Sequence, residues 1–344
     1  AGGGTDNIER FPIQADGTLG TGEPLSLPGF TSGMAISQDG KLLWVGLLGA
    51  EALNPSAGII EVDTSNWAIE RSLDLDAVVW DLLFLPESDE LYVSDLGGDG
   101  IHIVDLQVFK ETGIIEVPIS PAGMEIDPIK HLVWVAVSGT DAIATIDPQT
   151  HLVTQWTPVT DLAWIDEDGE PLPYSNVNSI EYDPATDRLY ATRGADNAVS
   201  VFSAADMTLL GSFPTAWYPT DVVVIPDSQT VIVAEGKGFG KGPDDISLSE
   251  EELSELQRDG SVSFIHMPGI DLEETTELAN DAFGRPSSLI PPCDGFFPIP
   301  LQKGQQSPIE HVILVVKENK TFDCVFGDLE NMDVDVDPSL VRWG

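Results

Sequence analysis

Apolar and polar residues alternate in short runs along the first 280 residues, and turns rich in Asp, Pro and Gly separate the runs. One repeated unit contains an apolar strand, a turn, a strand with a central large residue, a polar loop, a third strand and a more polar fourth strand. The unit recurs at intervals of about 42 residues with loop insertions, a period in the range of propeller blades. Its central positions are Trp44, Tyr92, Trp134, Tyr190 and Ile232. The alternation and the turns predict antiparallel meanders and exclude a helical repeat.

Four short strands per unit are typical of one blade of a β-propeller. Residues 30–281 contain five such units, and residues 8–28 predict the last two strands of a further blade, joined through Asp16-Gly17. We found no two clear strands downstream that would complete this further blade. The sequence therefore predicts an all-β fold, a β-propeller of four-stranded blades, over residues 1–281.

The repeated text resembles the YVTN family of seven-bladed propellers. The similar segments are LYVSD from Leu91, LYATR from Leu189, AVSVFS from Ala198 and SVSFIH from Ser261. Together with the five units and the partial blade, this resemblance implies six or seven blades.

The charge balance narrows the possible partners. The chain has 58 acidic against 15 basic side chains, a formal net charge of −43. Such a surface repels phosphates, which argues against nucleic-acid binding and against docking on anionic lipid. A high-salt environment or bound divalent cations would both explain it. The acidic loop at Asp166, Glu167 and Asp168 fits no EF-hand spacing and is interpreted as a solvated loop.

The chain contains no apolar run long enough to span a membrane as a helix, and its start lacks the pattern of a signal peptide. A mature exported protein has already lost such a peptide, so we expect an extracellular, periplasmic or cell-surface location. The two cysteines, Cys293 and Cys324, fit no zinc pattern. They are either a disulfide pair in an exported chain or two buried thiols.

The repeat ends at a segment rich in Pro, Gly and Ser, residues 282–307, which we interpret as a linker or strap. Residues 308–344 have a different character and begin PIEHVILVVKENKTFDCVFGDL. The run HVILVV predicts a strand buried on both faces of a parallel sheet. A polar turn and the start of a helix follow it, so the segment predicts the first strand, turn and helix of an α/β domain.

This segment resembles the start of the phosphoesterase family that contains acid phosphatases and phospholipases C, in the alkaline phosphatase superfamily. The resemblance implies that Glu318 and Asn319, at the end of the strand, are ligands of a divalent metal ion (Ca, Mg, Mn, Fe or Zn). Carboxylate and amide oxygens suit hard cations. Thr321 is placed where its hydroxyl caps the next helix or, alternatively, acts as a nucleophile. A resemblance to propeller–phosphatase fusions extends upstream to the WYPTDV strand at Trp217 and the GKG loop that follows it.

The remaining ligands and the nucleophile of such an enzyme come later in the family's sequence, so the catalytic site is incomplete in this chain. The parent protein is therefore predicted to hydrolyse a phosphate ester, while the chain alone is predicted to be inactive and to need the remainder of the phosphoesterase domain. The alternative is a non-catalytic propeller for surface assembly, adhesion or ligand recognition, with a protein partner at one face. A propeller enzyme of the lactonase or calcium phytase kind would need inward-facing Glu, Asp, Asn and His residues around the central channel, and the sequence reveals no such repeated set.

Overall fold

The computed structural model describes residues 6–48, 57–161, 164–165, 171–172, 174–238 and 260–282, with residues 309 and 311. The chain divides into two compact units, and the elements below belong to the unit made of Ala1–Phe239 and Gly260–Ser287. No helix in the described ranges is long and apolar enough to cross a membrane.

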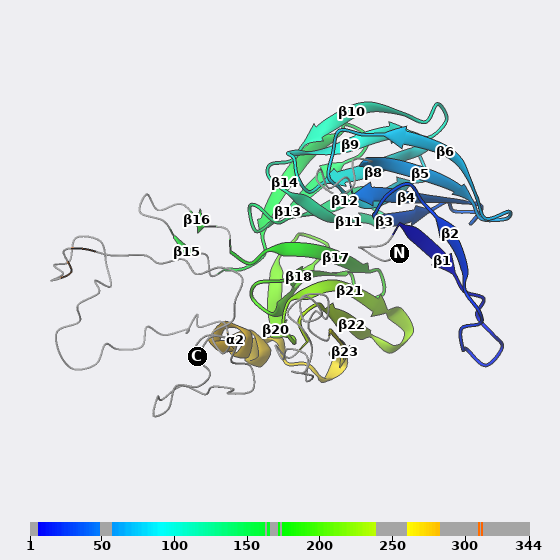
Figure 1. Ribbon diagram of the computed structural model, residues 1–344. Helices are drawn as coiled ribbons and strands as arrows, with labels where there is room; N and C mark the ends of the chain where they lie inside the picture. The colour runs from blue at the N-terminus through cyan, green and yellow to red at the C-terminus, as the bar shows by residue number, and fades with distance from the viewer. Residues whose placement is uncertain are drawn as a thin grey trace. The chain divides into compact units, whose positions relative to one another are not determined.

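Four antiparallel four-stranded sheets follow one another along the chain (Figure 1). Blade 1 comprises β3 (Thr31–Ile36), β4 (Leu42–Leu48), β5 (Ala57–Asp63) and β6 (Ala68–Asp74). Blade 2 comprises β7 (Val79–Leu85), β8 (Glu90–Asp95), β9 (Gly100–Asp105) and β10 (Lys110–Glu116). Blade 3 comprises β11 (Pro121–Asp127), β12 (Leu132–Val137), β13 (Ala142–Asp147) and β14 (Leu152–Pro158). Blade 4 comprises β17 (Val177–Asp183), β18 (Arg188–Arg193), β19 (Ala198–Ser203) and β20 (Leu209–Pro214).

The remaining described elements form smaller sheets and helices. Blade 5 has three described strands, β21 (Pro219–Ile225), β22 (Thr230–Glu235) and β23 (Ser261–His266). Two two-stranded sheets are formed by β1 (Asn7–Arg10) with β2 (Glu23–Ser26), and by β15 (Trp164–Ile165) with β16 (Pro171–Leu172). The helices are the 3-10 turns η1 (Pro226–Ser228) and η2 (Met267–Gly269) and the α-helix α2 (Leu272–Ala282).

These sheets confirm the predicted β-propeller, and they correct its details. The described residues form five blades rather than six or seven, because β1 and β2 contribute only a two-stranded sheet to the further blade. The chain after β23 continues into α2 rather than a fourth strand. Asp271 accepts hydrogen bonds from the Glu273 and Glu274 amides, so an N-cap followed by acidic first-turn residues specifies this helix.

The large central residues of the repeat occupy equivalent places. Trp44, Tyr92, Trp134 and Tyr190 lie in the second strand of their blades and are at most 2% exposed. In blade 2, Tyr92 packs with Ile101 and Ile103 against Val133 and Val135 of blade 3. The aromatic face of one blade therefore meets the first- and second-strand residues of the next blade.

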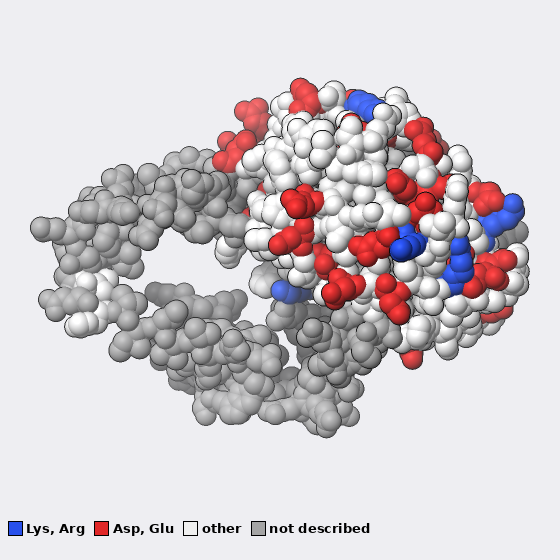
Figure 2. Space-filling model, turned by 90° about the horizontal axis from the view of Figure 1, so that it is seen from above, with Lys and Arg blue, Asp and Glu red and all other residues white. Residues whose placement is uncertain are grey.

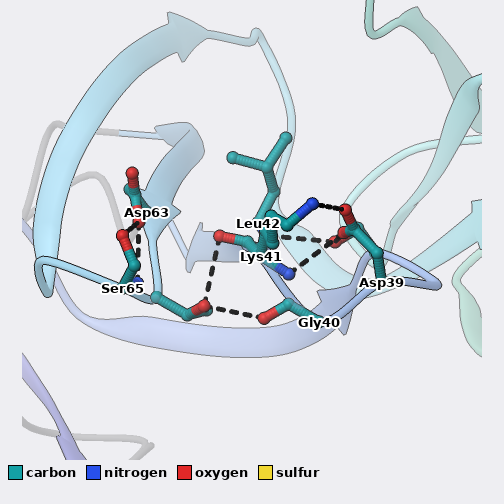
Figure 3. Close-up of polar contacts among 8 residues, drawn as sticks. Asp39, Gly40, Lys41, Leu42, Asp63 and Ser65 are labelled. Atoms are coloured by element: carbon teal, nitrogen blue, oxygen red, sulfur yellow. Dashed lines mark hydrogen bonds and ion pairs between the residues drawn. The ribbon is translucent and has the colours of Figure 1, made fainter.

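Aspartates at strand ends form the turns of the blades. Asp63 accepts hydrogen bonds from the Ser65 amide and hydroxyl, and Asp147 accepts one from the Gln149 amide. This side-chain bond fixes the turn that the Asp-rich sequence predicts. In the neighbouring turn of blade 1, Asp39 binds Lys41 and Ser37, and these bonds lower the pKa of its carboxyl to about 2 (Figure 3).

Loops between blades are held by a second repeated polar position. At this position a side-chain oxygen accepts a hydrogen bond from a backbone amide of the loop that leads to the next blade. The acceptor and donor pairs are Asp99 with Ile119, Asp141 with Asn176, and Asn197 with Tyr218. Ile119, Asn176 and Tyr218 have positive φ angles of 37°, 53° and 60°. These bonds therefore help to hold conformations that such residues seldom adopt.

Helix α2 covers the outer strand of blade 4. The Ser212 amide donates to the Thr276 hydroxyl at 2.7 Å, and the Thr275 hydroxyl donates to the Ser212 carbonyl at 2.8 Å. Gly211 has a φ of +147°, and a Cβ there would lie 2.9 Å from the Leu272 carbonyl oxygen, so this approach needs glycine.

An ion pair between a buried glutamate and a partly exposed arginine connects blades 1 and 2. Glu61 is 3% exposed and binds Arg71 through both carboxylate oxygens, at 2.7 and 2.6 Å, and it also accepts the Trp44 indole N–H at 3.0 Å. Arg71 reaches the Leu106 carbonyl in blade 2 and lies over the Phe109 ring, 4.3 Å from its centroid. The guanidinium therefore satisfies Glu61 and fixes the next blade.

We predict that Arg71→Ala lowers the free energy of unfolding by about 3 kcal/mol, because it leaves the Glu61 carboxylate buried without its cation. Urea unfolding followed by circular dichroism measures this change. The control is Lys41→Ala, which removes an exposed pair with Asp39 and should cost much less, because water screens this pair. Equal losses in the two variants would contradict a special role for the pair of Glu61 and Arg71.

Candidate functional site

The site residues predicted from the sequence lie outside the described residues. This holds for the proposed metal ligands Glu318 and Asn319, for Thr321, and for the cysteines Cys293 and Cys324. Their roles stay predictions. The candidate site below is built from described residues that the sequence analysis did not select.

Acidic side chains gather on the first strands of the blades. The strands β7, β11, β17 and β21 contact one another in chain order. They carry Asp81, Glu125, Glu181 and Asp221 respectively. Glu125 and Glu181 are equivalent, since they lie opposite Trp134 and Tyr190. Asp81 and Asp221 are also equivalent, because the residue after each of them pairs with the middle of the second strand. Leu82 pairs with Val93 in blade 2, and Val222 pairs with Val233 in blade 5.

Asp81 is held by backbone groups of two blades. Its carboxylate accepts the Leu82 amide at 2.8 Å and the Met124 amide of blade 3 at 2.9 Å. Burial nevertheless raises the pKa of Asp81 to about 6, with repulsion from Asp221 adding to the effect. The other neighbour is Gly33, where a Cβ would lie 2.6 Å from the Asp81 Cα, so glycine admits this close approach.

Glu125 has the most strongly altered ionisation of the four. Burial, together with the charges of Glu181 and Asp81, raises the pKa of its carboxyl to about 8, although the hydrogen bond from the Ile126 amide lowers it. Burial also raises the pKa of Glu181, with contributions from Asp221 and Asp183, although Glu181 accepts the Val224 amide. Glu125 is therefore mainly protonated at neutral pH.

Asp221 completes the set and is more exposed than the others. Its carboxylate accepts a hydrogen bond from the Ser179 hydroxyl of blade 4 at 2.7 Å. It accepts a second one from the amide of the next residue, Val222, at 2.9 Å. Asp81 and Asp221 thus each connect two blades. The four acids are positioned by strands rather than loops, which fixes them precisely.

This arrangement has two chemical capacities. A protonated Glu125 beside a mainly ionised Asp81 offers a proton donor and a proton acceptor with separated pKa values, the pattern of general acid–base pairs. The negative potential also favours a cationic group in the same space. In the part of the chain that the structure describes, no three His, Cys, Asp or Glu side chains are placed to hold a metal ion.

The sequence analysis missed this set, although a signal for it was present. It expected no repeated inward acids, yet the first strands read DLLF from Asp81, GMEI from Gly123, SIEY from Ser179 and DVVV from Asp221. The acid stands at the first position of these segments in blades 2 and 5 and at the third position in blades 3 and 4. A search at one fixed position of the repeat therefore finds only half of the set.

A second polar cluster lies where the second strand of blade 4 ends. Arg193 and Asp196 are 2% and 3% exposed and pair at 3.3 Å, and Asp196 also accepts the Ser175 hydroxyl at 2.7 Å. Nearby Asn178 donates to the Pro219 carbonyl of blade 5. These contacts join a loop and two blades, so we assign the cluster a structural role.

The acidic surface predicted from composition is visible on the described residues. Figure 2 shows Asp and Glu side chains spread over the face in view, with few Lys or Arg between them. This distribution agrees with the net charge of −43. It leaves the four strand acids in a generally negative field, which weakens any tendency to ionise.

Comparisons with known proteins support the fold. The sequence model of the glutamine cyclotransferase family matches residues 55–195, which is less than half of the chain. No curated protein matches significantly. Similar solved structures include a functionally unknown protein from Desulfotomaculum acetoxidans DSM 771, with 15% identity, a TM-score of 0.52 and coverage of 69% of this chain and 72% of that one.

Two further structures are similar. A chain of the nidogen/laminin complex has 14% identity and a TM-score of 0.52, and the match covers 68% of this chain and 83% of that one. The hydrazine synthase of Kuenenia stuttgartiensis has 22% identity and a TM-score of 0.48; the match covers 61% of this chain and 56% of that one. The two matches with a TM-score of 0.52 show, at these identities, a propeller fold alone.

We predict that Glu125→Gln raises the melting temperature most at high pH. The pKa of Glu125 in the folded protein, about 8, lies above the ordinary glutamate value of 4.5, so the folded state loses stability as pH rises between these values. The glutamine cannot ionise, and its advantage should grow from near zero at pH 4.5 to a plateau above pH 8. Each kcal/mol corresponds to about 2–4 °C in a domain of this size.

Differential scanning fluorimetry across this pH range measures the effect. The control is Glu116→Gln, which removes an exposed carboxylate of β10. A Glu125→Gln advantage that is the same at every pH would contradict the raised pKa.

Proposed function

We propose that this chain is the propeller-containing portion of an exported metal-dependent phosphoesterase. The observation that carries the proposal is the segment KENKTFD after the apolar run HVILVV, with its resemblance to the start of the phosphoesterase family. In the complete protein, Glu318 and Asn319 are ligands of a divalent cation, and the substrate is a phosphate ester.

The donor set explains why the chain alone should be inactive. One carboxylate and one amide oxygen are suitable ligands for a hard cation, but they fill only part of its coordination shell. Bound by its full set of ligands, the ion would supply charge stabilisation for the transferred phosphoryl group. The chain would therefore supply two metal ligands, Glu318 and Asn319, at the end of a strand. The propeller would support the catalytic domain or shield the entrance to its active site.

We predict that Glu318→Gln in the complete protein lowers kcat/KM for a phosphate ester by about 100-fold, in the range reported for altered electrostatic groups in active sites. Hydrolysis of 4-nitrophenyl phosphate and its bis-ester, together with metal content after dialysis, measures the effect. The matched control is Glu310→Gln, before the apolar run.

Two results would overturn this proposal. Full activity of the Glu318→Gln protein would remove the ligand assignment, and hydrolysis by the 344-residue chain alone would contradict the incomplete site. A complete protein that binds no divalent metal and hydrolyses no ester would favour the alternative, a non-catalytic propeller for surface assembly, adhesion or ligand recognition.

A second candidate function is favoured by the family match over residues 55–195, which include both Asp81 and Glu125. Cyclising an N-terminal glutamine joins the α-amino nitrogen to the side-chain amide carbon and releases ammonia. The amine must lose a proton and the departing nitrogen must gain one. Asp81 as proton acceptor and Glu125 as proton donor match this requirement, with pKa values of about 6 and 8.

We predict for this second candidate that the 344-residue chain converts a peptide with N-terminal Gln into the cyclised product, detected by mass spectrometry as loss of one ammonia. Glu125→Gln should lower the rate by about 100-fold or more, within the usual contribution of general acid–base catalysis. Glu116→Gln is the control. Absence of turnover over the spontaneous rate would exclude the candidate and leave the phosphoesterase proposal untouched.

A further inference from the structure

The two-stranded sheet of β1 and β2 occupies a defined place in the propeller repeat. The Leu27 amide donates to the Asp6 carbonyl at 2.7 Å. In every blade with four strands, the amide of the residue after the fourth strand donates in the same way to the carbonyl of a residue at, or directly before, the start of the third strand. The donor and acceptor pairs are Leu75–Ala57, Val117–Asp99, Val159–Asp141 and Thr215–Asn197. β1 and β2 are therefore the third and fourth strands of a blade that precedes blade 1.

The links to the next blade give the same assignment. Residues 27–30 connect β2 to β3, and residues 75–78 connect β6 to β7. Arg10 of β1 donates to the Thr64 carbonyl of blade 1, and Ile8 and Leu27 pack with Val45 and Val62. The partial blade is thus seated on blade 1 as a complete blade would be.

One edge of β1 is available for pairing. In the complete blades the third strand pairs with both the second and the fourth, as β9 does with β8 and β10. Within the described residues β1 pairs with β2 alone. Its second edge therefore presents amide and carbonyl groups in the geometry that accepts another strand.

The face of blade 1 beside this edge is uncovered. Met34 is 44% exposed, while the equivalent residues of the other blades are only 2–6% exposed. These equivalents pair with the same position of the second strand as Met34 does; they are Leu82, Met124, Ile180 and Val222. Ile36, two residues further along β3, is 55% exposed, whereas its equivalent in blade 4, Tyr182, is 8% exposed. Two apolar side chains thus lack the cover that their equivalents have.

We propose that the open edge of β1 and the face formed by Met34 and Ile36 accept one β-hairpin, which supplies the first and second strands of the blade ending in β1 and β2. Its second strand pairs with β1, and its apolar face covers Met34 and Ile36. The occupant is an antiparallel hairpin of the kind that supplies the first and second strands of every complete blade, in which the strands follow each other as a meander.

Blade 3 defines the chemistry of this hairpin. In the hairpin of β11 and β12, Trp134 packs against Ile180 and Tyr182 of blade 4, with ring centroids of Trp134 and Tyr182 5.3 Å apart. Ile180 and Tyr182 are the equivalents of Met34 and Ile36. An antiparallel hairpin with a large aromatic residue in the middle of its second strand therefore fits the face.

The test adds such a hairpin to the chain. A copy of residues 121–137 is fused ahead of Gly3, so that residues 3–6 form a four-residue loop like that between β12 and β13. The expected result is amide exchange at β1 slowed by about tenfold or more, as for strands paired on both edges. Oxidation of Met34 by dilute peroxide should slow in parallel. The matched control is the same fusion with the copied Trp134 changed to Asp.

Two further variants make the test specific. Met34→Glu in the fusion should remove most of the protection at β1, while Phe264→Ser, which changes an exposed apolar residue of β23, should leave it intact. Unchanged exchange at β1 in the fusion, or equal protection by the Asp control, would overturn the proposal. So would a dimer of the unfused chain, seen by light scattering, that Met34→Glu dissociates, because a second copy would then be the occupant.

Discussion

Face-to-face packing of consecutive sheets is the interaction on which this molecule depends. Each of blades 1 to 4 buries an aromatic-centred face against the first two strands of the next blade, as Tyr92 does against Val133 and Val135. A single blade has two apolar faces and cannot bury either alone, so stability comes from neighbours. The consequence is that the two ends of the series differ physically from its middle. At one end β1 and β2 cover part of blade 1, while at the other end Phe264 of blade 5 is 70% exposed.

The sequence predicted the repeated architecture well because each blade carries its own local signals. Alternation, strand-end Asp residues and a central large residue act within about 40 residues, so no long-range knowledge is needed. The partial blade at residues 8–28 was also predicted and is confirmed as a two-stranded sheet. The number of blades was wrong, because six counts the two strands at residues 8–28 as a whole blade and seven was taken from a family resemblance.

The acids of the first strands could not be recognised in the same way. Their meaning depends on which blades become neighbours and on how deeply each carboxyl is buried, and both are properties of the assembled propeller. Asp81 illustrates this, since its carboxylate is held by an amide from Met124 in the next blade, 43 residues away in sequence. The metal ligands proposed at Glu318 and Asn319 were predicted by resemblance alone and lie outside the described residues, so they stay a prediction.

The helix that ends the described propeller also bears on how the protein behaves at high concentration. An outer strand with free amides and carbonyls is a template on which another chain can extend the sheet, the first step toward aggregation. On β20 the hydroxyls of Thr275 and Thr276 occupy the Ser212 amide and carbonyl, so this strand is closed to such growth. The outer strands β6 and β10 instead carry exposed charges, among them Glu70, Lys110 and Glu116. The chain thus protects its perimeter in two ways, by a helical cover in one blade and by electrostatic repulsion in others.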